Sequence, residues 1–192
     1  CITRQVRTVS ATDIHWPRKP RILFVAAAPG GTTVPLEPHL QALHKAIKPW
    51  LEPFNEDSSE DLAKKVSKIL TVLPEATVEE VEKACCETAF THVHILAHGM
   101  QNEKLPGLPY GLALHSRSDK DEFDTVSGTR FASVLGAQKS GEMPAVVTVA
   151  SCDSGNVGSV IYTGASFAHD LHRAGIPFVV ASQFPLSFAG SV

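Results

Sequence analysis

The sequence predicts an α/β fold in which helices flank a mainly parallel central sheet. Apolar runs of strand length alternate along the chain with segments whose apolar residues recur every three or four positions. The strand-like runs are apolar almost throughout, which is typical of strands whose two faces are both covered. The chain has 192 residues, 43% of them hydrophobic, and is therefore long enough to bury one core of this kind.

Five segments have the length and composition of buried strands, and each is followed by a turn, a loop or a helical pattern. The first, RILFVAAAP, ends at Pro29-Gly30-Gly31, a strong turn signal. The five predicted strands are residues 21–29, about 69–73, 91–99, 144–152 and 176–186. Residues 1–20 show no period and are interpreted as a linker or edge segment. Residues 21–192 would then form one domain, which we expect to be incomplete at its C-terminal end.

Helical periodicity lies between these strands. Thr77 with Glu80 three residues later has the spacing of a capping box, and Gly175 stands where a helix would stop. A polar loop, residues 55–61, precedes the second helical run. The helical runs are Leu36, Leu40, Leu43, Ile47 and Trp50; Leu62, Val66 and Ile69; Val78, Val81, Ala84 and Cys85; residues 129–137; and residues 166–175.

The segment 99–128 is expected to be a long loop with one short strand, YGLALHS, at residues 110–116. Loops longer than about 15 residues are uncommon unless they are functional or disordered. We therefore expect this segment to be functional or disordered. Its acidic residues are either a solvated surface or part of a substrate-binding flap; they are Asp119, Asp121, Glu122 and Asp124.

Composition argues against several classes of function. A net charge of −3 gives no long-range attraction to nucleic acid or to an anionic membrane. No apolar stretch approaches the roughly 18 residues that a membrane span needs, and the N-terminus lacks the apolar centre of a secretory signal. The four cysteines include no C-x-x-C pair to bind zinc, and a chain of this size does not need a disulfide framework. A reducing cytoplasm fits this cysteine usage.

His98 and Cys152 each end a predicted strand, where the loops of a parallel sheet converge on a site. A Cys152 thiolate could attack a carbonyl, with His98 as the base and later the acid. The backbone N–H groups of Gly99 and Cys152 could stabilise the oxyanion. The alternative is a hydrogen-bonded histidine and a small apolar thiol at the ends of two core strands. His92 and His94 lie earlier in their strand and are weaker candidates.

Other polar residues have less specific patterns. Asp153, beside Cys152, could bind a basic substrate side chain, although an Asp at this place more often caps a turn. His169 and His172 lie on one predicted helix with no evident third ligand, so no metal site is expected. No glycine-rich nucleotide-binding motif is present, so Pro29-Gly30-Gly31 is interpreted as a plain turn.

Several of these segments together resemble the CHAT domain, a family of caspase-like cysteine peptidases. The resemblance covers roughly residues 20–190 and is carried by RILFVAAAP, HILAHG, YGLALHS with SGTRFASVL, VVTVASCDSGN and ASFAHDLHRAGIPFVVASQFPLS. A His about 50 residues before the Cys is also a caspase-like separation, although the caspase Q-A-C-x-G signature is absent. Phe184 stands where the family commonly has Trp.

The resemblance implies a caspase-like three-layer sandwich and hydrolysis of a peptide bond in a protein or peptide substrate. His98 and Cys152 would form the dyad, with no metal and no cofactor. The family further implies a regulatory partner or attached sensor, such as a tetratricopeptide-repeat protein, and a role in prokaryotic defence. Because not every CHAT domain has a demonstrated activity, a catalytically silent interaction module is the alternative.

Overall fold

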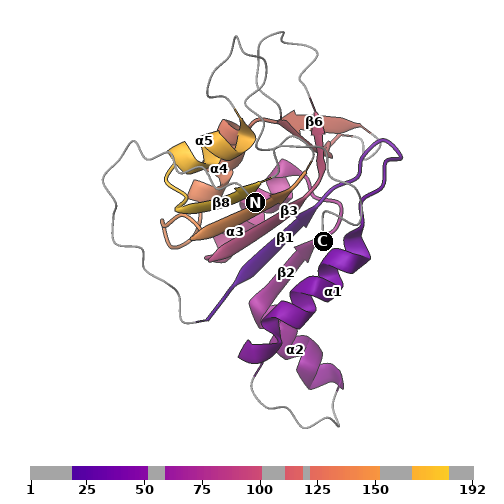
Figure 1. Ribbon diagram of the computed structural model, residues 1–192, viewed down its shortest axis with the longest axis vertical. Helices are drawn as coiled ribbons and strands as arrows, with labels where there is room; N and C mark the ends of the chain where they lie inside the picture. Colours follow the sequence, from indigo (N-terminus) through magenta and orange to yellow (C-terminus); the bar gives the residue numbers. More distant parts are fainter. Residues whose placement is uncertain (1–18, 52–58, 101–110, 119–121, 152–165, 182–192) are drawn as a thin grey trace.

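A five-stranded parallel sheet forms the centre of the protein (Figure 1). The structure is a computed structural model, and it describes residues 19–51, 59–100, 111–118, 122–151 and 166–181. The strand order is β2-β1-β3-β7-β8, and every neighbouring pair is parallel. The strands are β1 (Ile22–Ala26), β2 (Leu70–Leu73), β3 (His92–Leu96), β7 (Val146–Ala150) and β8 (Phe178–Ala181). The predicted α/β class with a parallel sheet is confirmed.

Helices cover both faces of this sheet. Successive strand residues point to opposite sides, and because the strands are largely apolar, both faces need to be covered. On one face, Leu23, Ile95 and Val149 belong to a core shared with three helices. Those helices are α3 (Val78–Glu87), α4 (Gly128–Gly136) and α5 (Phe167–Arg173). We call this side the α3–α5 face.

The opposite side, the α1–α2 face, has a smaller core. Phe24, Leu96 and Ala150 of three adjacent strands belong to it, together with Ile47. It is covered by α1 (Leu36–Ile47) and α2 (Ser59–Ile69), which Figure 1 shows on the side of the sheet away from α4 and α5. The three layers are those of a caspase-like sandwich.

Side-chain caps explain where three of the helices begin. Thr77 and Glu80 form the predicted capping box at the start of α3. Ser127 and Ser166 each accept a hydrogen bond from the backbone three residues later, at the starts of α4 and α5. Each cap satisfies an N–H group that the first helical turn leaves without a partner. After α5, Gly175 adopts a φ of +107°, which an L side chain rarely tolerates, as expected for a helix stop.

The long segment after His98 differs from the prediction. It contains three strands that form a separate antiparallel sheet, β4-β5-β6, rather than a loop with one strand. The strands are β4 (His98–Met100), β5 (Gly111–His115) and β6 (Phe123–Val126). The sequence FDTV of β6 is short and partly polar, so no apolar run marked it as a strand.

Smaller differences lie at element ends. Trp50 was expected on the apolar face of the first helix, but α1 ends at Ile47 and a short 3₁₀ turn, η1 (Lys48–Trp50), follows. The Trp50 side chain is 45% exposed there. Helix α2 begins at Ser59, inside the predicted polar loop. The predicted continuation of β8 over residues 182–186 and most of the 1–20 segment lie outside the described residues.

Because α4 packs closely against α5, we expect that one methyl group added at Gly128 lowers the stability of the fold. A Cβ at this position would lie 2.7 Å from both the Asp170 Cβ and the Phe167 carbonyl oxygen. Because a helix backbone cannot yield as a flexible side chain does, we expect Gly128→Ala to lower the free energy of unfolding by about 1–3 kcal/mol. Urea unfolding followed by circular dichroism measures this change.

Ser133→Ala is the matched control, since Ser133 is exposed on the same helix. Its free energy of unfolding should stay within about 0.5 kcal/mol of the wild-type value. Equal stability of the Gly128→Ala and Ser133→Ala variants would show that α4 and α5 do not meet as closely as described.

Candidate active site

His98 lies at the point where the chain leaves the parallel sheet. Strand β3 ends at Leu96, Ala97 follows, and His98 begins β4, where it pairs with Ala113 of β5. The sequence predicted His98 as the last part of a core strand, whereas it is the first residue of a strand in the second sheet. The change of sheet places a half-buried histidine between the two sheets.

The His98 ring is held by a backbone carbonyl of the loop that follows β1. Its Nε2 lies 3.1 Å from the carbonyl oxygen of Thr33, in the segment between β1 and α1. A carbonyl oxygen only accepts hydrogen bonds, so Nε2 is the donor and carries the proton. In the neutral ring, Nδ1 is then unprotonated and can accept a proton.

The segment that carries the Thr33 carbonyl is stabilised by a turn within it and by a bond near its start. The Thr32 hydroxyl donates to the Pro29 carbonyl over 2.8 Å, closing a turn. Earlier in the segment, the Ala28 backbone N–H donates to Nε2 of His115, a buried residue of β5. His115 must be unprotonated at Nε2 to accept this bond. The first strand's loop is therefore fastened to the antiparallel sheet that begins with His98.

The strand that leads to Cys152 lies next to the strand that leads to His98. β7 pairs with β3 in parallel, and the last register pair is Leu96 with Ala150. Ser151, the next residue, is buried. Cys152 and Asp153 lie outside the described residues, as does Phe184. The register therefore establishes that the chain leaves β3 and β7 at the same level of adjacent strands.

Gly99 lies within β4, opposite Leu112 of β5. Its proposed contribution, a backbone N–H directed at a substrate carbonyl, stays a prediction.

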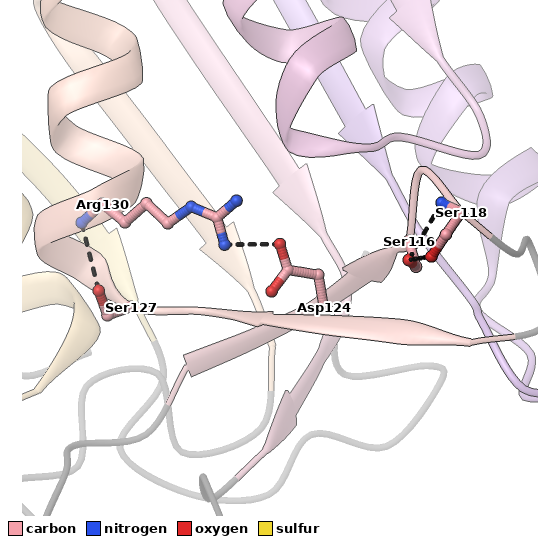
Figure 2. A network of polar contacts seen from close by, with 5 residues as sticks. All are labelled: Ser116, Ser118, Asp124, Ser127 and Arg130. Atoms are coloured by element: carbon pink, nitrogen blue, oxygen red, sulfur yellow. Dashed lines mark hydrogen bonds and ion pairs between the residues drawn. The ribbon is translucent and has the colours of Figure 1, made fainter. Parts of the chain in front are cut away.

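Two of the four acidic residues of the predicted flap lie in the described part of the chain. Asp124 is on β6, and its carboxylate pairs with Arg130 of α4 at 2.5 Å, as Figure 2 shows. The Glu122 carbonyl accepts the backbone N–H of Ser116. Asp124 therefore joins the second sheet to α4 beside the Ser127 cap, which favours a structural role for this residue. Asp119 and Asp121 lie outside the described residues.

Sequence analysis missed a histidine pair beneath α1. Nδ1 of His39, on α1, lies 2.8 Å from Nε2 of His94, on β3, and the Phe24 ring of β1 packs on both. Only 2% of His39 is exposed. Burial lowers the pKa of His39, and burial together with the nearby His39 lowers the pKa of His94 to about 4. The signal was two histidines, His92 and His94, at alternate positions of a strand whose other residues are apolar.

Cys85 is unsuited to act as a nucleophile. Burial, with the neighbouring Cys86 adding to it, raises the pKa of the Cys85 thiol to about 12. Cys86 is exposed. Within the described ranges, no cluster of three or more His, Cys, Asp or Glu side chains could hold a metal ion. None of the described helices has both the length and the apolar character needed to cross a membrane.

Comparison with known families places this geometry in context. The sequence profile of the CHAT domain matches residues 3–192. The chain belongs to the CHAT domain family. A comparison with curated proteins found no match. CHAT domains are a caspase-like family, which agrees with the three-layer sandwich.

The histidine pair of this CHAT domain predicts an acid-sensitive fold. An unfolded His takes up a proton near pH 6.5, whereas His94 in the fold resists protonation until about pH 4. Unfolding therefore takes up a proton between these pH values, and acidification favours the unfolded state. We expect His94 to contribute up to about 3 kcal/mol that is present above pH 6.5 and lost towards pH 4. Urea unfolding at a series of pH values measures this loss.

His94→Gln should flatten the pH dependence, since the amide can replace the Nε2 bond but does not titrate in this range. His44→Gln, on the exposed side of α1, is the control and should keep the wild-type slope. If wild type and His94→Gln lose stability in parallel between pH 6.5 and 4, another group is responsible.

Proposed function

We propose that this CHAT domain is a cysteine endopeptidase that cleaves a protein substrate through a His98–Cys152 dyad. One observation carries the proposal: Nε2 of His98 donates to the Thr33 carbonyl, which leaves Nδ1 as the proton acceptor. A nucleophile, a base and a group that orients the base together form the general arrangement for covalent acyl transfer. Cys152, one residue beyond Ser151, would supply the nucleophile.

The proposed reaction has two stages. His98 Nδ1 takes the proton of the Cys152 thiol, and the sulfur attacks the peptide carbonyl carbon. The C–N bond then breaks, the leaving amine takes the proton from His98, and a thioester remains. In the second stage, His98 takes a proton from water, the hydroxide attacks the thioester, and the acid product leaves as the thiol regains its proton. The Thr33 carbonyl would stabilise the imidazolium in both stages.

Two further groups complete the proposed site. The backbone N–H groups of Gly99 and Cys152 would bind the developing oxyanion, a contribution of roughly 3–4 kcal/mol per donor in other acyl-transfer enzymes. Gly99 supports this assignment through its place on β4, directly after His98. Asp153 would select a basic residue before the cleaved bond. The family also suggests that a regulatory partner, such as a tetratricopeptide-repeat protein, activates the domain. It further suggests that the domain acts in the cytoplasm.

Mapping of newly formed protein N-termini tests the proposed activity. A proteome incubated with the wild-type protein and its activating partner should yield N-termini that are missing with Cys152→Ala. His98→Ala should give the same loss, a decrease of at least about 10³-fold in cleavage rate, because the thiol then lacks its base. Cys86→Ala is the control and should cleave at the wild-type rate. Identical N-termini from wild type and Cys152→Ala would exclude the peptidase.

Alkylation of Cys152 tests the dyad without a known substrate. In a Cys1→Ala, Cys86→Ala background, the pH profile of iodoacetamide labelling should show a thiol pKa below the usual value of about 8.5. His98→Ala should return the profile to that value and slow labelling at pH 7 by about tenfold, the factor for one pKa unit. Peptide mass spectrometry assigns the label to Cys152.

A binding module is the second candidate, and the outer strand of the described sheet favours it. Phe178 and Val180 of β8 lie on the α1–α2 face and are 40% and 45% exposed, which is unusual for large apolar side chains of a central sheet. A Cys152 pKa near 8.5 that is unchanged by His98→Ala would support this module over the peptidase.

A further inference from the structure

The His39–His94 pair and the Thr33–His98 bond lie on the same elements. His94 and His98 are four residues apart on consecutive strands, and Thr33 and His39 lie on either side of the start of α1. Two side-chain bonds therefore link the same stretch of chain to the same segment of β3 and β4. The His39–His94 pair lies beneath α1, whereas the Thr33–His98 bond involves the candidate base itself.

The pair determines how α1 lies on the sheet. Aliphatic side chains of α1, such as Ile47 and Leu40, also pack on this face. Hydrophobic contact has no directional preference and tolerates small slides of a helix over a sheet. A hydrogen bond between two buried rings tolerates much less, because a donor–acceptor distance of 3.6 Å no longer counts as a bond. At 2.8 Å, the His39–His94 bond sets the position of the first turns of α1.

The chain between His39 and Thr33 is stiff enough to transmit this position. Pro35 has a fixed φ at the start of the helix, and its carbonyl accepts the backbone N–H of His39. The Leu36 N–H donates to the Val34 carbonyl over 2.8 Å. A shift of α1 by about 1 Å would break the 2.8 Å His39–His94 bond, and the Thr33 carbonyl, moving by a similar amount, would lose its 3.1 Å bond to His98 Nε2.

We propose that His39 and His94 are positioning residues that hold the Thr33 carbonyl against His98 and thereby maintain its Nε2–H tautomer. The proposal rests on the proposed function for its effect on rate, but its effect on the His98 ring does not depend on catalysis. Loss of the pair would let His98 carry its proton on Nδ1, the nitrogen that must accept the proton of Cys152. The peptidase would then lose turnover more than substrate binding.

Nuclear magnetic resonance of ¹⁵N-labelled imidazoles is the decisive measurement, since it reports the tautomer of His98 directly. His39→Leu/His94→Leu replaces the pair with two apolar side chains and leaves no buried ring without a partner, so the fold is expected to persist. We expect the Nε2–H tautomer of His98 to fall from dominant to a mixture. The kcat for a cleaved peptide should fall by about tenfold, with KM changed by less than threefold.

His39→Asn is the conservative rescue variant, because its amide nitrogen can take the place of Nδ1. It should keep the wild-type tautomer of His98 and at least a third of the wild-type kcat. A folded double-Leu variant with the wild-type His98 tautomer would overturn the proposal, whether or not the protein is a peptidase. A shifted tautomer without any cleavage by the wild type would retain the positioning and exclude the proposed function.

If the double-Leu variant does not fold, the single variant His39→Leu decides the matter, since it removes the ring that α1 contributes and leaves His94 on β3. At a pH where the His98 ring is neutral, we expect a smaller Nε2–H fraction of His98 than in the wild type. An unchanged fraction in the folded variant would overturn the proposal.

Discussion

The parallel pairing of β3 with β7 is the constraint on which the candidate site depends. Its register brings Leu96 and Ala150 to the same level, so the chain departs from two adjacent strands at one edge of the sheet. The pairing is stable because both faces are covered, by α1 and α2 on one side and by α3, α4 and α5 on the other. A slip of one residue in either strand would turn its side chains to the opposite face, moving Ile95 or Val149 from the α3–α5 face to the α1–α2 face. The apolar residues of both strands thus fix the register, and with it the level at which the chain leaves β3 towards His98 and β7 at Ser151.

The second sheet turns the end of a core strand into a candidate site. Had β3 continued straight, His98 would have remained part of the central sheet. Instead, the break at Ala97 starts β4, which pairs with β5 and through it with β6. The Asp124–Arg130 ion pair and the Ser127 cap attach β6 to α4, while the bond from Ala28 to His115 attaches β5 to the loop after β1. The segments around His98 are therefore joined to both helical layers.

Neutral histidines recur in these contacts for a physical reason. An imidazole can donate at one nitrogen and accept at the other, and it does so without the desolvation cost of a charge. His39 and His115 are buried and His94 is half-buried, and each makes a hydrogen bond through a ring nitrogen. Carboxylates or amines in the same places would need counter-charges that the apolar face, with Phe24 at its centre, does not supply. The result is a rigid but acid-sensitive layer between α1 and the sheet.

The sequence alone determined the α/β class, all five parallel strands, the helices and the two caps at Thr77 and Gly175. It could do so because burial on both faces makes strands apolar throughout, and because helix ends depend on local hydrogen bonds. It also selected His98 from position alone and identified the CHAT family from its motifs. The proposed functions of Cys152, Gly99 and Asp153 stay predictions at that level.

Only the tertiary structure decided which groups meet. The β4-β5-β6 sheet depends on pairing between short segments with weak patterns, and Phe123–Val126 carries too little apolar character to predict it. The His39–His94 pair and the Thr33–His98 bond join residues that are distant in sequence, and no local pattern encodes such contacts. Their partners are chosen by helix placement and strand register, which arise from the packing of the whole chain.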